Sequence, residues 1–73
     1  MNYKKIAIVG AGGWGTALSL HLAEKFDHVS LWVYETELCQ IIQKERENKW
    51  FLPGFPLPGN IFPDPSLEKV VRG

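Results

Sequence analysis

The sequence has almost no cysteine and no long hydrophobic run, and each absence excludes a class of protein. Cys39 is the single cysteine, so no internal disulfide can form, and no cluster of cysteine and histidine has the spacing of a zinc site. This composition fits a reducing compartment, and we expect a cytoplasmic protein. No apolar stretch reaches the roughly 18 residues of a membrane span, and the N-terminus lacks the apolar core and cleavage site of a signal peptide.

An excess of charge of either sign is also lacking. Eight Lys and Arg residues balance eight Asp and Glu residues, which gives a formal net charge of zero. No overall field then draws the chain to nucleic acid or to an anionic membrane surface, so any anion must be bound by local geometry. What the sequence does contain is 45% hydrophobic residues in a chain of 73, a composition that folds around a small core.

The apolar segments of the first half predict alternating strands and helices. Residues 6–9 form an uninterrupted apolar run before a glycine, which is typical of a strand buried on both faces of a parallel sheet. Residues 16–26 carry apolar side chains at helical spacing, and residues 29–33 are predicted to form a second strand. Thr36 is the predicted N-cap of a second helix. The residues that this helix turns inward are Leu38, Ile41 and Ile42.

The second half of the chain contains all five prolines. Prolines and glycines within residues 48–60 exclude a regular helix and any central strand there, and so predict a loop. A short third strand at residues 61–62 and a last helix at residues 67–72 complete the order strand, helix, strand, helix, strand, helix. That order predicts an α/β fold, namely half of a Rossmann-type, doubly wound parallel sheet. The apolar residues expected to pack the loop are Trp50, Phe51, Leu52 and Phe55.

The predicted sheet has a consequence for assembly. In such a half the strands lie in the order 3-2-1, and a fourth strand normally lies beside the first. We therefore expect residues 1–73 to be the N-terminal part of a larger dinucleotide-binding domain, without its fourth and later strands. Residues 6–9 would then form an unpaired apolar edge, which favours homo-oligomers or aggregation.

The strongest motif is Gly-x-Gly-x-x-Gly at Gly10, Gly12 and Gly15, between the first strand and the first helix. In this motif the first glycine permits a tight turn, the second lacks the Cβ that would block a pyrophosphate, and the third lets the helix pack closely on the strand. Free N–H groups of the first helical turn then point at the phosphates. Glu35 follows Gly15 by 20 positions, roughly the spacing at which a carboxylate binds the adenosine ribose. The pattern predicts dinucleotide binding, although the motif alone also occurs as a glycine-rich turn in unrelated folds.

Two longer motifs carry a resemblance to a family. The stretch Gly10-Ala-Gly-Gly-Trp14-Gly-Thr-Ala-Leu18 resembles the NAD(P)-dependent glycerol-3-phosphate dehydrogenases, in which a tryptophan and Gly-Thr-Ala or Gly-Ser-Ala follow the second glycine. Downstream, Asn48-Lys-Trp-Phe-Leu-Pro-Gly54 with the trailing Leu57-Pro-Gly-Asn60 is similar to the Asn-x-x-Tyr/Phe-Leu-Pro-Gly loop of that family. The resemblance covers essentially the whole chain.

The resemblance implies roles for particular residues. Tyr34 and Glu35 would meet the adenosine end of the cofactor, and Phe51 stands at the aromatic position of a loop that lies near the cofactor in the family. Because many bacterial members carry arginine where this chain has Tyr34, we expect NAD rather than NADP. The residues that would surround the pyrophosphate are Gly10, Ala11, Gly12, Gly13, Trp14 and Gly15.

The resemblance also implies a reaction, the interconversion of dihydroxyacetone phosphate and sn-glycerol 3-phosphate by hydride transfer, in glycerophospholipid metabolism. The family's catalytic lysine and its helical C-terminal substrate domain lie beyond these residues, so we expect no catalytic residue here and no activity of the chain alone. Two alternatives stay open: another Rossmann-type dehydrogenase, such as a hydroxyacyl-CoA or sugar-nucleotide enzyme, and a nucleotide-binding or interaction module without chemistry.

The remaining candidates have simpler interpretations. His21 and His28 are expected at the surface or at an interface, because neither has a second metal ligand at suitable spacing. Cys39 is interpreted as a half-buried packing residue, and Trp32 as part of the core. For Trp14 two interpretations stay open, packing and contact with the cofactor.

Overall fold

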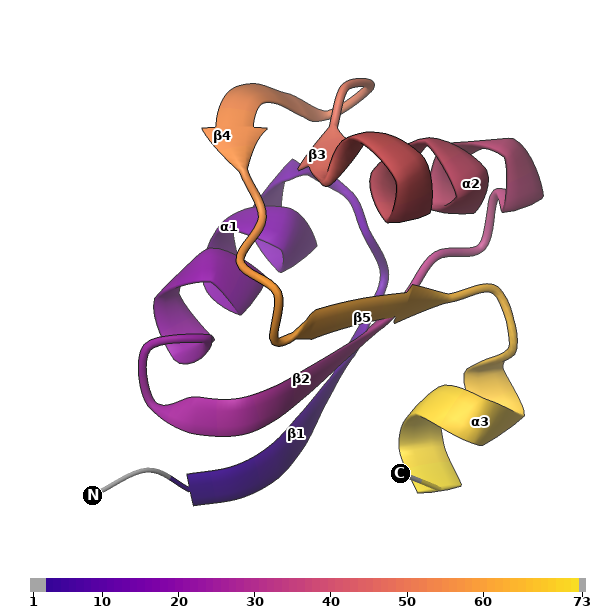
Figure 1. Cartoon of the computed structure of the whole chain (residues 1–73). Coiled ribbons are helices and arrows are strands. Elements are labelled where there is room, and N and C mark those ends of the chain that lie inside the picture. Colours follow the sequence, from indigo (N-terminus) through magenta and orange to yellow (C-terminus); the bar gives the residue numbers. More distant parts are fainter. Residues whose placement is uncertain (1–2, 73) are drawn as a thin grey trace.

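Three parallel strands with helices on both faces make up the fold of the computed structural model, which describes residues 3–72 (Figure 1). The sheet has the strand order β1-β2-β5 and is parallel throughout. This is the predicted order of the first, second and third strands of a Rossmann-type half. The elements are β1 (Tyr3–Val9), α1 (Gly13–Leu22), β2 (Phe26–Trp32), α2 (Thr36–Glu45), β3 (Glu47–Asn48), β4 (Leu52–Pro56), β5 (Ile61–Asp64) and α3 (Leu67–Arg72).

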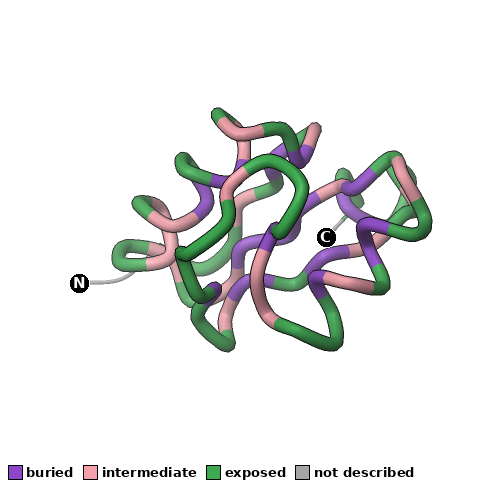
Figure 2. Tube along the Cα trace, turned by 90° about the horizontal axis from the view of Figure 1, so that it is seen from above, coloured by how far each residue is buried: buried purple, intermediate pink, exposed green. Residues whose placement is uncertain are grey.

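The core lies on one face of the sheet, between the strands and helices α1 and α2. Val29, Leu31 and Val33, at every second position of β2 and just beyond it, are fully buried, and Ser30 between them is buried as well. They pack with Leu38 and Ile42 of α2, and buried residues gather toward the middle of the chain trace (Figure 2). Helix α3 lies on the opposite face, where it covers the sheet only in part (Figure 1).

This one-sided core corrects the expectation for the first strand. Only Ile8 of residues 6–9 is buried, and Ala7 and Val9 are exposed. The short helix α3 reaches β1 but does not cover its whole outer face. The uninterrupted apolar run therefore predicts a strand correctly, but burial on both faces was wrong for the described residues.

The first helix ends earlier than predicted. It stops at Leu22 instead of residue 26, because Phe26 already belongs to β2 and pairs with Tyr3 of β1 in the parallel register. The turn between α1 and β2 is held from outside: the Nδ2 of Asn60 donates to the carbonyl oxygens of Ala23 and Phe26, at 2.8 and 2.9 Å.

The second helix starts and ends with unexpected residues. Its N-cap is Glu35, and Thr36, the predicted cap, is the first helical residue. At the other end Arg46 adopts a left-handed conformation with φ 56°, which is unusual for a residue with a side chain. The Arg46 guanidinium donates to the carbonyl oxygens of Pro58 and Ile61, at 2.7 Å each, and these bonds help to hold that turn.

The proline-rich segment is not simply a loop. Strands β3 and β4 pair antiparallel in a small two-stranded sheet of their own. Proline is tolerated there because both strands are edge strands. The expectation that aromatic residues pack this segment was also wrong, since Trp50, Phe51 and Phe55 are all exposed. Asn48 and Leu57 are the buried residues there.

Candidate functional site

The carboxyl ends of the three parallel strands meet at one edge of the sheet, where ligands of open α/β sheets bind. Strand β1 runs directly into the glycine turn, residues 10–15, and the N–H of Gly10 donates to the carbonyl oxygen of Trp32 at the end of β2, at 3.2 Å. The N–H of Val33 donates to the carbonyl oxygen of Asp64 at the end of β5, at 3.0 Å. The glycine turn and the residues after β2 are thereby brought to the same edge.

Two of the three motif glycines are required by the chain itself. Gly10 has a φ of 108°, a conformation that residues with a side chain rarely adopt. A Cβ at Gly15 would overlap the carbonyl oxygen of Gly10, because α1 crosses closely over the end of β1. Both roles agree with the sequence interpretation.

Gly12 is different, because nothing in the chain requires a glycine there. It is the N-cap of α1 with the ordinary φ of −68°, and a Cβ at this position would meet no heavy atom within 4 Å. The space beside Gly12 is therefore open. A glycine that neither its own backbone nor its neighbours require fits a position that a ligand approaches closely, as a pyrophosphate does in this type of turn.

The start of α1 offers hydrogen-bond donors to that space. The first amides of a helix have no acceptor within the helix, and here they belong to Gly13, Trp14 and Gly15. Among residues 3–72, the N–H of Gly12 also has no acceptor. The N-cap of α1 makes no side-chain hydrogen bond and the first turn holds no acidic residue, so this end of the helix suits an anion.

The backbone of Phe51 lies close to the glycine turn. A Cβ at Gly13 would lie 3.3 Å from the carbonyl oxygen of Phe51, so the backbone of the segment between β3 and β4 runs beside the start of α1. The side chain of Phe51 is 47% exposed and meets Trp50 edge-on, with ring centroids 6.4 Å apart. Phe51 is therefore partly exposed, and its backbone lies beside the turn.

Asn48 joins these two segments, and sequence reasoning assigned it no role. Its Nδ2 donates to the carbonyl oxygen of Ala11 and to the Oγ1 of Thr16, both at 2.7 Å, and its Oδ1 accepts from the N–H of Phe51 at 3.1 Å. The side chain is 0% exposed. The signal in the sequence is its place at the head of the Asn-x-x-Phe-Leu-Pro-Gly motif, which by itself indicates only the family.

The aromatic and acidic candidates lie in the open. Trp14 is 92% exposed, so packing within the described residues does not explain a large side chain there. Of the two interpretations from sequence, contact with a bound molecule remains. Tyr34 is 75% exposed, with its ring edge-on to Trp32 at a centroid distance of 5.8 Å. Glu35 caps α2 only through its backbone, since its side chain makes no capping hydrogen bond. Trp32 itself is half-buried and its Nε1 donates to the carbonyl oxygen of Pro65 at 3.0 Å, so the core interpretation of Trp32 was only partly right.

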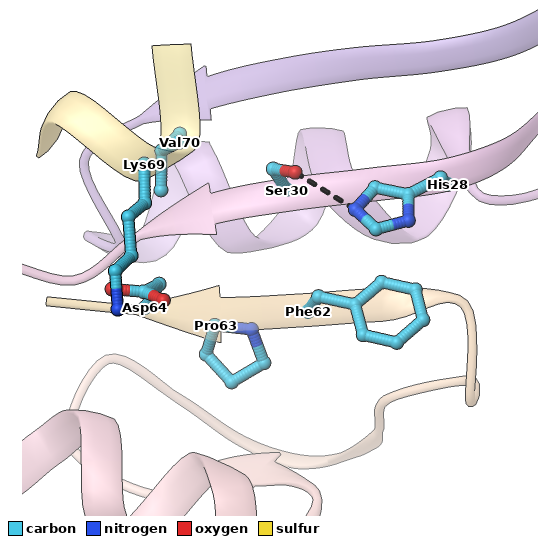
Figure 3. A pocket seen from close by; sticks show the side chains of 7 residues that line it. All are labelled: His28, Ser30, Phe62, Pro63, Asp64, Lys69 and Val70. Carbon is cyan, nitrogen blue, oxygen red and sulfur yellow. Dashed lines mark hydrogen bonds between the residues drawn. The ribbon is translucent and has the colours of Figure 1, made fainter. Parts of the chain in front are cut away.

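A cavity of about 210 Å³ lies elsewhere, on the face of the sheet that α3 partly covers (Figure 3). The rings of His28 and Phe62, from the neighbouring strands β2 and β5, stack there at 4.2 Å, and the Nε2 of His28 lies 3.0 Å from the Oγ of Ser30. Nowhere in residues 3–72 do three or more His, Cys, Asp or Glu side chains gather as metal ligands.

Cys39 is a core residue and not a reactive thiol. It is 1% exposed, which is more buried than the sequence interpretation assumed. Burial raises the pKa of the thiol, and the nearby carboxylate of Asp64 raises this pKa further. Both causes favour the protonated, unreactive form.

Comparison with known proteins places this geometry in a family. Residues 5–73 match the family described as NAD-dependent glycerol-3-phosphate dehydrogenase N-terminus. A glycerol-3-phosphate dehydrogenase of Syntrophobacter fumaroxidans, named for NAD(P)+, is 46% identical over 67 residues, which is 92% of this chain and 20% of that protein. A namesake from Legionella pneumophila is 38% identical over 72 residues, 99% of this chain and 22% of that protein.

Solved structures agree with the sequence comparison. The crystal structure of glycerol-3-phosphate dehydrogenase from Coxiella burnetii superposes with a TM-score of 0.86 at 39% identity, over 99% of this chain and 22% of that one. The Plasmodium falciparum enzyme gives a TM-score of 0.77 at 33% identity, over 96% of this chain and 22% of that one. The chain thus spans about a fifth of the length of the curated relatives that it matches. Within residues 3–72, every helix is too short or too polar to span a lipid bilayer.

Proposed function

The chain belongs to the NAD-dependent glycerol-3-phosphate dehydrogenase family, and we propose that its glycine turn binds the pyrophosphate of a nicotinamide dinucleotide. The observation that carries this proposal is Gly12, where the chain leaves open space although nothing in the chain requires a glycine. Family membership also decides between the dehydrogenases considered from sequence, and disfavours hydroxyacyl-CoA and sugar-nucleotide enzymes.

The residues at the turn have two different roles in binding the pyrophosphate. The N–H groups of Gly12, Gly13 and Trp14 donate to phosphate oxygens, and the positive end of the α1 dipole stabilises the negative charge of the phosphates. Trp14 and Phe51 flank the turn and shield the bound phosphates from water. No basic side chain is needed, because the donors are backbone amides.

Tyr34 and Glu35 bind the adenosine end. Both lie just beyond β2, beside the glycine turn, and the Glu35 carboxylate has no capping bond to occupy it. A free carboxylate there accepts a hydrogen bond from the ribose 2′-OH of NAD and repels the 2′-phosphate of NADP. We therefore propose NAD as the preferred cofactor. The cytoplasmic location predicted from composition belongs to the same proposal, with Cys39 as a buried free thiol.

The reaction of the whole protein is proposed to be the interconversion of dihydroxyacetone phosphate and sn-glycerol 3-phosphate. The dinucleotide, when bound, supplies hydride transfer, and these residues bind and orient it. Because the chain spans only about a fifth of the length of its relatives, we expect these 73 residues alone to give no change in absorbance at 340 nm with sn-glycerol 3-phosphate and NAD.

The test of binding is a titration of the ¹⁵N-labelled chain with NAD, followed by two-dimensional NMR. We expect the largest shifts at the amides of residues 12–15, with smaller ones at residues 34–36 and 51. Shifts that gather instead at His28, Ser30 and Phe62, around the cavity in Figure 3, would place the ligand elsewhere. A spectrum unchanged at millimolar NAD would refute dinucleotide binding by this chain.

A further inference from the structure

Asn48 uses every polar atom of its side chain on the glycine turn or beside it. Both of its amide hydrogens are donated, to Ala11 and Thr16, and its oxygen accepts from Phe51. The hydroxyl of Thr16 also donates to the carbonyl oxygen of Ala11, at 3.3 Å. The carbonyl oxygen of Ala11 is thus held by two side chains that are both 0% exposed.

Holding that carbonyl fixes the direction of the next amide. A trans peptide unit is planar, and its C=O and N–H point in opposite directions. No cis peptide occurs among the described residues, so the inward carbonyl of Ala11 turns the N–H of Gly12 outward, into the open space beside the turn. If the peptide between Ala11 and Gly12 rotated, a carbonyl oxygen would point into that space and repel phosphate oxygens. Gly12 opposes such a rotation only weakly, because glycine is conformationally permissive.

We propose that Asn48 is a positioning residue for the dinucleotide: it holds the Ala11–Gly12 peptide in the orientation that presents the Gly12 N–H to the phosphates. The same side chain holds the backbone of Phe51 next to Gly13, so the turn and the β3–β4 segment act as one unit. This inference rests on the proposed function, since it assigns Asn48 to the same pyrophosphate site.

The chain offers a matched control in Asn60. Its Nδ2 also donates to two carbonyl oxygens far back in the sequence, those of Ala23 and Phe26, at 2.8 and 2.9 Å. Those bonds hold the opposite end of α1, away from the glycine turn (Figure 1). Asn60→Ala therefore removes the same kind of contact without changing the Ala11–Gly12 peptide.

The experiment measures dissociation constants of NAD, ADP and adenosine for the unaltered chain, Asn48→Ala and Asn60→Ala, together with thermal unfolding of each. We expect Asn48→Ala to weaken the affinity for NAD and for ADP at least tenfold. The affinity for adenosine should change less than twofold, because adenosine lacks the pyrophosphate. Asn60→Ala should lower the melting temperature but change all three constants less than twofold. Loss of adenosine binding in parallel with NAD, or equal losses in both variants, would show a merely structural role and overturn the proposal.

Thr16 supplies a second pair of variants if Asn48→Ala does not fold. Thr16→Val removes the hydroxyl that bonds Asn48 and Ala11, whereas Thr16→Ser keeps it. We expect Thr16→Val to weaken the affinity for NAD several-fold and Thr16→Ser to keep the affinity of the unaltered chain. Equal affinities of the two variants for NAD would contradict the proposal. Failure of the unaltered chain to bind NAD would refute the proposed function and this inference with it, whereas normal binding by Asn48→Ala would refute only the inference.

Discussion

Gly15 lies so close to Gly10 that a side chain at position 15 would overlap the carbonyl oxygen of Gly10. Helix α1 approaches the end of β1 so closely at this point that the backbone must shift to admit even a methyl group. We expect Gly15→Ala to lower the free energy of unfolding by about 1–3 kcal/mol, the usual cost of overpacking, as measured by urea denaturation.

Gly59→Ala is the control for that substitution. A Cβ at Gly59 would meet nothing within 4 Å, and its φ is not in the left-handed region. This variant should keep the stability of the unaltered chain or slightly exceed it, because alanine restricts the unfolded state. Equal stability of the two variants would mean that α1 is not in close contact with β1.

The parts of the fold that sequence predicts are those decided by local chemistry. Residues 6–9 form a strand because they are apolar and largely β-branched and end at a glycine, and the glycine turn forms because Gly10 takes a positive φ. The roles of Gly10 and Gly15 follow from spacing alone. The placement of the dinucleotide on these residues stays a prediction.

The parts that sequence misses depend on distant contacts. Helix α1 stops at Leu22 because β2 must begin at Phe26 opposite β1, which no property of residues 23–25 reveals. Asn48 is polar and stands in a proline-rich segment, where a solvent-exposed turn residue is the usual expectation. Its burial follows only from Ala11 and Thr16, which lie 37 and 32 positions earlier in the chain.

Tyr34 provides a test of cofactor preference. The 2′-phosphate of NADP needs a cation, which neither Tyr34 nor Glu35 supplies, and Arg binds phosphate bidentately. We expect the unaltered chain to bind NAD at least tenfold more tightly than NADP, which corresponds to about 1.4 kcal/mol. Tyr34→Arg should lower this ratio of the NAD affinity to the NADP affinity about tenfold. Tyr34→Phe is the control and should leave it unchanged. Equal affinities before mutation, or no gain for NADP in Tyr34→Arg, would contradict the assignment of these residues to the ribose.

Strand β1 gives a prediction about association. Among the described residues β1 pairs only with β2, and the Val9 side chain is 58% exposed. Unpaired apolar edges recruit other strands, so we expect light scattering to show a mass that rises with protein concentration. Val9→Lys should reduce this association, because edge lysines oppose strand pairing. A monodisperse monomer at high concentration would contradict the prediction.

Cys39 predicts how stability changes in alkaline solution. Burial, aided by Asp64, raises the pKa of this thiol in the folded chain, so the unfolded chain loses the proton at lower pH than the folded chain. The contribution of Cys39 to stability is then complete below the thiol pKa of the unfolded chain, about 8.5, and is lost as pH rises beyond it through the raised folded value. We expect the stability difference between the unaltered chain and Cys39→Ala to shrink from pH 8 to pH 10 in urea denaturation. A constant difference over that range would show that the folded thiol titrates normally.

The central claim is that the open space beside Gly12 receives the pyrophosphate, and calorimetric titration with NAD of a Gly12→Val and Gly59→Val pair tests it most directly. Neither position has an atom within 4 Å of a new Cβ, and neither needs a left-handed backbone, so both variants should fold like the unaltered chain. If phosphates occupy the space at Gly12, Gly12→Val should weaken NAD at least a hundredfold, whereas Gly59→Val should bind it with unchanged affinity. Undiminished affinity in folded Gly12→Val would contradict the account.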